Sequence, residues 1–392
     1  MNYPESTNPG TEAAGQVATA RSKIMLVTRP LHAAPSGGRE LLCKLNHDTL
    51  ESLRADRLLL VELPYVRPSS PAQMLNAFRG HIDGLDHASI SAALARIESE
   101  SVAQVFIDGS NLGEFARAVK ARFPRVEVIT FFHNVEARFF LGALRQSRSI
   151  RAFAVLVANY LAERKAVRYS DKLIALSQRD SLQLKALYGR FATHIVPMAL
   201  QDKVPQDSAS RDGDAETGRY ALFVGGVFYA NQAGITWFVE QVVPRIDIKI
   251  CIVGRGFEGL RQVLERDGKV EVVGAVESLA DWYRNAQFVV APIFDGSGMK
   301  TKVAEALMFG KRVIGTPEAF SGYEGVAEKA GVVCSGADEF VAAINAFDVR
   351  GDARSDATLR AIYEAEYSQR AFRAKIARVV DGPAAVAPTD AR

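Results

Sequence analysis

Residues 295–316, DGSGMKTKVAEALMFGKRVIGT, are the stretch on which the interpretation of the whole chain depends. Its glycine-rich start permits backbone conformations that bring the main chain close to a ligand. Residues 299–309 have the composition of a helix with one apolar face, and Gly310 is typical of the position just after a helix. Two β-branched residues then begin a short apolar run. The stretch therefore predicts a loop, a helix and a buried strand in direct succession.

The start of this predicted helix suits a phosphate group. A helix N-terminus presents unpaired N–H groups and the positive end of a dipole, and Lys300 and Lys302 place two cations beside it. Glu305 follows about one turn later, where a carboxylate is useful if it binds a sugar diol. The pattern predicts a site for a nucleotide diphosphate with its ribose attached. The alternative is an ordinary helix–strand unit with a solvated lysine pair.

The same residues resemble the donor-binding motif of GT-B glycosyltransferases similar to glycosyltransferase family 4. In many of these enzymes an E-x7-E motif ends in a Glu that binds the ribose, and Glu305 matches that second Glu. Ser297 stands in place of the first Glu, so the stretch looks like the G-x-G-x-K-x-K-V-x-E-A variant of many bacterial polysaccharide transferases. The resemblance implies that Lys302 and Glu305 are catalytic. It also implies donor contacts from Gly296, Ser297, Gly298, Met299 and Lys300.

Length and composition indicate a globular protein of two domains. The chain has 392 residues, 48% of them hydrophobic, and a net charge of +3 that is too small to indicate nucleic-acid binding. The three cysteines are far apart, and no C-x-x-C pair or histidine cluster indicates a metal site, so we expect a reducing compartment and no metal. No signal peptide and no apolar run of about 18 residues is recognised. We therefore expect a cytoplasmic protein.

In the first half of the chain, apolar runs alternate with helical patterns, which predicts a parallel sheet with helices on both faces. Ligands bind such sheets beyond the carboxyl ends of the strands. His133 follows one predicted strand, and Gly37 and Gly38 follow the first. The HNVE run at His133 looks like the family's active-site His loop, so the resemblance makes His133 catalytic and the two glycines donor or acceptor contacts. From the residues alone, a lone His is more often a hydrogen-bonded structural residue, the two glycines can equally form a tight turn, and Glu136 is a helix N-terminal charge.

Residues 138–172 combine basic and apolar side chains. Eight arginines and lysines face only two acidic residues, and Phe139, Phe140 and Leu141 lie among them. A basic amphipathic face can dock on anionic lipid, or it can be a solvated face over an ordinary core. Many polysaccharide transferases act on lipid-linked acceptors, so the resemblance favours peripheral contact with the inner face of the membrane.

Residues 201–218 are rich in Asp, Ser and Gly and predict a linker between domains. They contain Asp212-Gly213-Asp214, the D-x-D triplet with which GT-A transferases hold a divalent cation. In those enzymes the triplet follows a buried strand, whereas here it lies in a polar loop. We therefore assign no metal ligand to it.

The second half restarts the alternation of strands and helices, and residues 254–259 form a G-x-G-x-x-G run after a predicted strand. A dinucleotide site also needs an acidic residue at the end of the next strand, but Glu271 begins that strand. Arg255 in this run is a candidate for the donor diphosphate. By resemblance, Val276 belongs to the loop that recognises the nucleobase. Many relatives carry an Arg just after the first strand of the second domain, where this chain has Gly226 and its neighbours and no Arg.

These observations predict a GT-B architecture, an α/β fold of two Rossmann-like, doubly wound parallel-sheet domains facing a cleft. The predicted parts are a disordered segment 1–20, an acceptor-side domain 21–200, a linker 201–218, a nucleotide-sugar domain 219–365, a helix 366–380 that crosses back, and a tail 381–392.

The resemblance implies a hexosyltransferase that moves a sugar from a nucleotide diphosphate sugar to a glycan or lipid-linked acceptor in surface polysaccharide biosynthesis. It implies retention of anomeric configuration, without a metal or other cofactor. Lys300, Lys302 and the helix N–H groups from about Gly298 onward would stabilise the departing diphosphate. Two alternatives remain: a non-catalytic GT-B relative that binds sugar nucleotides, and a nucleotide-dependent epimerase or dehydrogenase.

Overall fold

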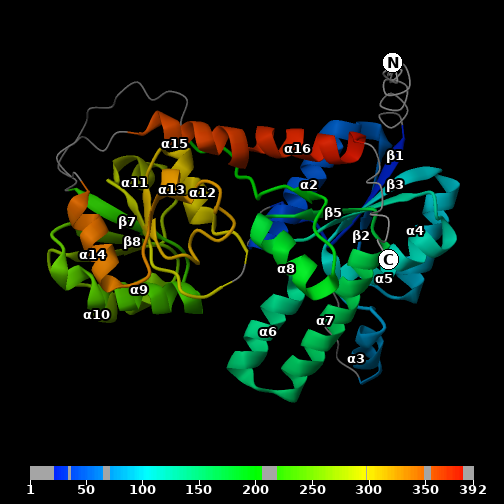
Figure 1. Cartoon of the computed structure of the whole chain (residues 1–392), viewed down its shortest axis with the longest axis horizontal. Coiled ribbons are helices and arrows are strands. Elements are labelled where there is room, and N and C mark those ends of the chain that lie inside the picture. Colours follow the sequence, from blue (N-terminus) through cyan, green and yellow to red (C-terminus); the bar gives the residue numbers. More distant parts are fainter. Residues whose placement is uncertain are drawn as a thin grey trace, which may run out of the picture. The chain divides into compact units, whose positions relative to one another are not determined.

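The computed structural model describes residues 22–33, 37–64, 71–204, 219–296, 298–347 and 355–382. Contacts divide the chain into two units (Figure 1), the first formed by residues up to 196 together with those from 372 onward, and the second by residues 197–371. The predicted segment 1–20, most of the linker with its D-x-D triplet, Ser297 and the tail from 383 lie outside the described residues. No helix in the described ranges is both long and apolar enough to span a membrane.

The first unit is built on a six-stranded parallel sheet in the order β2-β1-β3-β4-β5-β6. Its strands are β1 (Lys23–Thr28), β2 (Leu58–Glu62), β3 (Val102–Asp108), β4 (Glu127–Phe131), β5 (Lys172–Ala175) and β6 (His194–Ile195). Its helices are α2 (Gly38–Arg54), α3 (Pro71–Phe78), α4 (His87–Ser99), α5 (Gly113–Arg122), α6 (Glu136–Ser147), α7 (Ile150–Tyr169) and α8 (Gln178–Tyr188). The central strands are buried over nearly their whole length, as expected when helices cover both faces of a sheet.

The last helix, α16 (Gln369–Asp381), packs on the first unit from Phe372 onward. Its final carbonyl groups have no N–H donors within the helix, and buried side chains of the sheet supply the donors. Lys172 Nζ donates to the carbonyl oxygens of Val379 (2.7 Å) and Gly382 (2.9 Å). Gln104 Nε2 donates to the carbonyl oxygen of Val380 at 2.7 Å. The end of the chain is therefore an integral layer of the unit that its beginning forms.

The second unit contains another six-stranded parallel sheet, in the order β12-β11-β10-β7-β8-β9. Its strands are β7 (Tyr220–Val224), β8 (Lys249–Val253), β9 (Val270–Gly274), β10 (Val289–Ala291), β11 (Val313–Gly315) and β12 (Gly331–Val333). Its helices are α9 (Tyr229–Gln241), α10 (Arg261–Leu264), α11 (Ala280–Asn285), α12 (Thr301–Met308), α13 (Ala327–Ala330), α14 (Ala337–Ala346) and α15 (Ala357–Ile362). A π-helical turn, Tyr363–Tyr367, follows α15.

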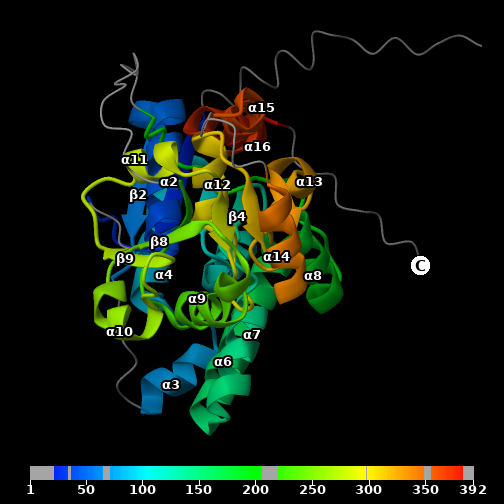
Figure 2. The same ribbon diagram turned by 90° about the vertical axis from the view of Figure 1, so that its left-hand side faces the viewer.

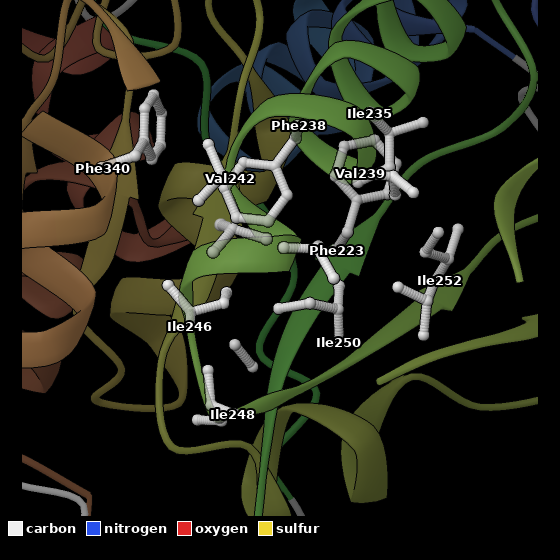
Figure 3. Close-up of a cluster of buried hydrophobic side chains, with 14 of the residues drawn as sticks. Phe223, Ile235, Phe238, Val239, Val242, Ile246, Ile248, Ile250, Ile252 and Phe340 are labelled. Carbon is white, nitrogen blue, oxygen red and sulfur yellow. The ribbon is translucent and has the colours of Figure 1, made fainter. Parts of the chain in front are cut away.

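Apolar side chains of α9 and α14 cover one face of this second sheet. Figure 3 shows Phe238 of α9, Val242 just after that helix, Phe223 of β7 and Phe340 of α14 in one buried cluster, with isoleucines of β8 beneath them. The rings of Phe238 and Phe340 meet edge to face with centroids 5.5 Å apart. This apolar cluster holds one face of the second sheet against α9 and α14, and the loops lie at the ends of the strands.

The predicted α/β fold of two Rossmann-like units is confirmed, and three element bounds differ from the prediction. The helix expected at 299–309 is α12, which begins at Thr301 because Lys300 has an extended backbone (φ −91°, ψ 112°) and its carbonyl oxygen accepts from Tyr323 Oη at 2.9 Å. The strand expected at 194–198 reduces to two residues. The helical pattern at 359–380 is interrupted at Ser368, whose backbone is extended.

Candidate functional site

The candidate donor site lies at the carboxyl edge of the second sheet, where β7 and β10 are neighbours. The chain continues from β7 to β8 on one side and from β10 to β11 on the other, so the loops after β7 and β10 diverge at this point. Such a switch in strand order is where doubly wound sheets bind ligands. The first loop contains Gly225 and Gly226, and the second contains the described residues 292–296 and 298–300, which lead into α12.

Lys302 joins the two loops. Its side chain is buried, and Nζ donates to Asn231 Oδ1 at 3.0 Å, while Asn231 Nδ2 donates to the carbonyl oxygen of Gly226 at 2.9 Å. The ammonium group also lies 4.6 Å from the ring centroid of Phe223, which favours a cation. A Cβ on Gly225 would lie 2.7 Å from Asn231 Nδ2, so the bridge requires glycine there.

Burial lowers the pKa of Lys302 to about 7, with Glu305 opposing the change and Lys300 adding to it. The surroundings therefore do not supply enough negative charge to keep this amine fully protonated at neutral pH. An anionic ligand at the same position would supply it. Lys302 is thus the feature of the second unit whose electrostatics most directly favour a diphosphate.

Glu305 lies one helical turn beyond Lys302 and is held by a buried tyrosine. Tyr283 Oη donates to Glu305 Oε2 at 2.9 Å, and the Tyr283 ring stacks on Phe309 with centroids 5.2 Å apart. Among the described residues, Tyr283 is the one hydrogen-bond donor to this carboxylate. The half-buried carboxylate is fixed in direction and retains acceptor capacity for a pair of hydroxyl groups.

The predicted donor loop is arranged around Lys300. Lys300 Nζ forms an ion pair with Glu318 Oε1 at 2.9 Å and donates to the carbonyl oxygen of Gly298 at 2.9 Å. Gly296 and Gly298 have φ values of 135° and 67°, a region that favours glycine. Met299 is buried. The structure thus places these four predicted residues in one loop before α12. The helix begins at Thr301, so the prediction that helical N–H groups start at about Gly298 is wrong.

Arg255 and Val276 lie in the loops after β8 and β9, along the same sheet edge. The amide of Val227 donates to the carbonyl oxygen of Arg255 at 3.0 Å, and the Arg255 side chain is exposed. Glu258 ties these loops together, since its carboxylate accepts from the amides of Gly256 and Ala275, both at 2.6 Å. Val276 follows directly and is half-buried. Gly226, Arg255 and Val276 therefore occupy successive loops beside the Lys302 bridge.

The geometry does not favour a dinucleotide site at residues 254–259. The last glycine of the run lies inside a 3-10 helix, Phe257–Leu260, and α10 after it has only four residues. Glu271, the candidate ribose ligand, forms an ion pair with Lys249 at 2.7 Å at the opposite end of the strands. Gly254 instead serves close packing, because a Cβ there would lie 1.7 Å from the carbonyl oxygen of Gly225.

In the first unit, His133 belongs to a buried hydrogen-bond network at the carboxyl edge of the sheet. His133 Nε2 lies 2.6 Å from Asp108 Oδ1, and Asp108 also accepts from Asn46 Nδ2 (2.8 Å) and Thr28 Oγ1 (2.7 Å). Burial opposes ionisation of Asp108, but His133 and the other donors outweigh it and lower the pKa of this carboxyl to about 2. The carboxylate fixes the orientation of the imidazole ring. Sequence reasoning missed Asp108, although it is the acidic last residue of a predicted strand.

Cys43 lies with Asp108 and His133 in a cluster whose ligand atoms are within 4.8 Å of one another. Burial raises the pKa of the Cys43 thiol well above its ordinary range, with Asp108 adding to the effect. Metals bind the thiolate, which this environment disfavours. Asp108 is moreover already occupied by three donors. The cluster therefore reads as a hydrogen-bond network that orients His133.

Gly37 and Gly38 begin α2 on the same edge of the first sheet, with Gly37 as the N-cap residue. The first-turn Arg39 is an anchor: its guanidinium donates to Asp83 (2.7 Å) and Asn111 (3.1 Å). Among the described residues, no atom lies within 4 Å of a Cβ built on either glycine.

Glu136 lies in the first turn of α6, as the sequence alone suggested, but the side chain that caps the first amides of this helix comes from α7. Glu163 performs that role, since its carboxylate accepts from the amides of Glu136 (2.9 Å) and Ala137 (3.2 Å). Burial raises the pKa of Glu136 to about 7, with Arg39 opposing and Glu163 reinforcing the shift. Nothing in the local sequence pattern identifies Glu163, which lies on α7.

Comparison with known proteins agrees with this arrangement. Residues 218–347, the greater part of the second unit, match the family described as glycosyl transferases group 1. No curated protein sequence matches the chain.

Solved structures share the fold of the whole chain. Sucrose-phosphate synthase from Thermosynechococcus elongatus has a TM-score of 0.66 at 15% identity, covering 91% of this chain and 98% of that one. HepE from Anabaena, solved in complex with UDP, has a TM-score of 0.65 at 16% identity over 92% and 100% of the two chains. WaaG, a glycosyltransferase involved in lipopolysaccharide biosynthesis, has a TM-score of 0.57 at 12% identity over 92% and 100%. At these identities the likeness concerns the fold, which is the predicted GT-B fold.

Proposed function

Because the second unit carries a group 1 glycosyl transferase sequence on a GT-B fold, we propose that the protein transfers a sugar from a nucleotide diphosphate sugar to an acceptor hydroxyl. The observation that carries the proposal is the buried Lys302 amine. It joins the two loops of the sheet switch point and has Glu305 one turn away. A solvated lysine pair, the plain alternative, does not account for a buried cation with a lowered pKa.

The chemistry follows from where charge develops. When the bond from the anomeric carbon to the diphosphate breaks, negative charge collects on the leaving oxygens. Lys302 and the first N–H groups of α12 are placed to stabilise it, and preorganised donors of this kind are each worth about 3–4 kcal/mol in comparable sites. Glu305, held by Tyr283, would accept from the two ribose hydroxyl groups and fix the register of the nucleotide. Lys300 would contribute through its ion pair with Glu318 by shaping the loop.

We propose uridine diphosphate as the nucleotide, because HepE, which has the same fold, was solved with UDP and with UDP-glucose. Val276 and its neighbours would contact the base, while Gly226 and Arg255 would lie along the diphosphate. The retained anomeric configuration, the absence of a metal requirement, hexose as the transferred sugar and the role in polysaccharide biosynthesis belong to the same proposal through the family resemblance. The acceptor would be a glycan or lipid-linked hydroxyl on the first unit, near His133 and the Gly37–Gly38 turn.

A thermal-shift screen against UDP, GDP, ADP and NAD, each with and without EDTA, tests the proposal. A ligand that binds only the native state raises the melting temperature by mass action. We expect UDP to raise it equally with and without chelator, and Lys302→Met to abolish the shift. A shift with UDP that EDTA removes would overturn metal independence. A shift with NAD alone would move the site to the Gly254 loop and favour a dehydrogenase or epimerase.

A further inference from the structure

The helical hairpin of α6 and α7 extends from the first unit (Figure 1 and Figure 2). Its sequence is free of acidic residues over most of its length. Between Glu136 and Glu163 the sequence contains no Asp or Glu, but it contains Arg138, Arg145, Arg148 and Arg151. All four arginines are exposed. Like charges without internal counter-charges repel one another on a helix surface, and a basic amphipathic helix is typical of one that lies on a membrane surface.

Large apolar side chains lie exposed at the end of the same hairpin. Ile150, the first residue of α7, is 89% exposed, and Phe153 on the next turn is 56% exposed. Arg148 and Ser149 form the tight connection between the two helices, and the Ser149 hydroxyl caps α7 by accepting from the amide of Ala152 at 3.1 Å. The apolar side chains are therefore presented by an ordered turn. We call residues 145–153 the hairpin tip.

Two lysines further along the basic segment, Lys165 and Lys172, are paired with carboxylates of the unit, whereas Arg164 and Arg168 on the later turns of α7 are exposed. Lys165 forms an ion pair with Glu114 at 2.6 Å, and Lys172 is fully buried against Glu127 at 2.8 Å. Ala158, Ala162 and Ala166 on the later turns of α7 are buried. Within the basic segment predicted over 138–172, exposed arginines adjoin the largely exposed Ile150 and Phe153 at the hairpin tip.

Apolar surface continues beside the hairpin. An apolar hollow of about 270 Å³ between α6, α7 and α8 is lined by Leu141, Leu156, Tyr160 and Leu187, with Arg138 at its side. Helix α3 packs against α7 and exposes Met74 (45%) and Leu75 (59%). A hydrocarbon chain beside a negatively charged headgroup complements this combination of apolar hollow and arginine, whereas a purely acidic protein surface would leave the apolar groups in water.

We propose that the hairpin tip is a membrane anchor: Ile150 and Phe153 enter the acyl boundary of an anionic bilayer, and Arg145, Arg148 and Arg151 bind the phospholipid headgroups. This inference assigns a defined site to the membrane contact that the sequence predicts for residues 138–172. It rests on the hairpin alone, so vesicle binding tests it without any sugar transfer.

The first experiment measures binding of the purified full chain to vesicles by flotation. We expect binding to vesicles of equal parts phosphatidylcholine and phosphatidylglycerol and much weaker binding to phosphatidylcholine alone. Ile150→Asn with Phe153→Asn should weaken binding at least about tenfold, because two largely exposed apolar side chains lose their transfer into lipid. Val263→Asn is the matched control: Val263 is 53% exposed in the second unit and should leave binding unchanged.

A second variant tests the charges. Replacing Arg145, Arg148 and Arg151 together by Gln should weaken binding to the anionic vesicles roughly 100-fold, at about 1 kcal/mol per cation near an anionic surface. Each variant is checked for an unchanged melting temperature and unchanged UDP binding. The proposal is overturned if the full chain does not float, if neutral and anionic vesicles bind alike, or if the tip variants bind as the unaltered chain does. A size-exclusion dimer that the Ile150 and Phe153 changes dissociate would identify a second copy as the occupant instead.

Discussion

The strongest prediction concerns the buried amine of Lys302 and its replacement by methionine. The pKa of Lys302 is lowered from 10.5 to about 7 by burial. Between these values the unfolded chain binds more protons than the folded one, so the free energy of unfolding rises with pH. From pH 7 to pH 9 the amine should add about 2 kcal/mol to this rise, less than the full 1.36 kcal/mol per pH unit because folded Lys302 is about half protonated at the lower pH.

Lys302→Met should remove this contribution. The hydrogen bond to Asn231 and the contact with Phe223 are lost as well, which shifts the stability of the variant, but only a group that exchanges a proton changes the slope with pH, and methionine has none. Urea unfolding of both proteins at the two pH values measures it, with Lys329→Met, at an exposed position, as control. Transfer activity should fall roughly 100-fold or more, as for the loss of one preorganised donor. If the stability curves of the two proteins stay parallel from pH 7 to pH 9, the amine is not the poorly compensated buried cation described above, and the electrostatic argument for a diphosphate fails.

Three further predictions follow from the same structure. Glu305→Gln retains an acceptor for Tyr283 Oη, so its melting temperature should stay close to that of the unaltered chain while sugar transfer falls about 10- to 100-fold; an unchanged initial rate would remove Glu305 from the site. Gly254→Ala should destabilise the chain by at least about 2 kcal/mol in urea because its Cβ meets the carbonyl oxygen of Gly225, whereas Gly259→Ala, with open space around its Cβ, should be neutral; a damaging Gly259→Ala would revive the dinucleotide interpretation. Lys172→Met removes the amine that caps α16 and pairs with Glu127, and should lower the free energy of unfolding by about 3 kcal/mol; a loss under 1 kcal/mol would show that α16 is held mainly by its apolar face.

The order of strands and helices could be predicted from sequence periodicity, because parallel strands that are covered on both faces appear as continuous apolar runs. Periodicity also placed Lys302 and Glu305 on one helix beside a glycine-rich loop, since residues three apart share a helix face. Gly310, with φ 65°, stands just beyond the end of that helix as predicted. These features depend only on near neighbours in the sequence.

The partners of the site residues could not be predicted because they come from distant segments. Asn231 is 71 residues from Lys302, and no spacing rule links an amide on α9 to an amine on α12. The start of α12 likewise depends on a hydroxyl of Tyr323, 23 residues further on, which holds the Lys300 carbonyl. The same limit applies to Asp108 and His133, which meet only because β3 and β4 are adjacent.

The basic segment shows a second limit. Its composition cannot tell an arginine that faces water from a lysine that a buried carboxylate neutralises, because both have the same charge in the sequence. Lys165 and Lys172 belong to the second kind, while Arg145, Arg148 and Arg151 belong to the first. Only the packing of α7 separates them.

The position of α16 has a consequence for biosynthesis. Residues 372–382 complete a unit whose other strands and helices all precede residue 197, so the ribosome must translate the entire second unit before the first can close. Until then the Lys172 amine has Glu127 but lacks its two carbonyl acceptors, and the groove for Phe372 and Ile376 is open to water. The nascent first unit would therefore wait in an incomplete state, and the second unit, contiguous in sequence, would be the first to reach its final structure.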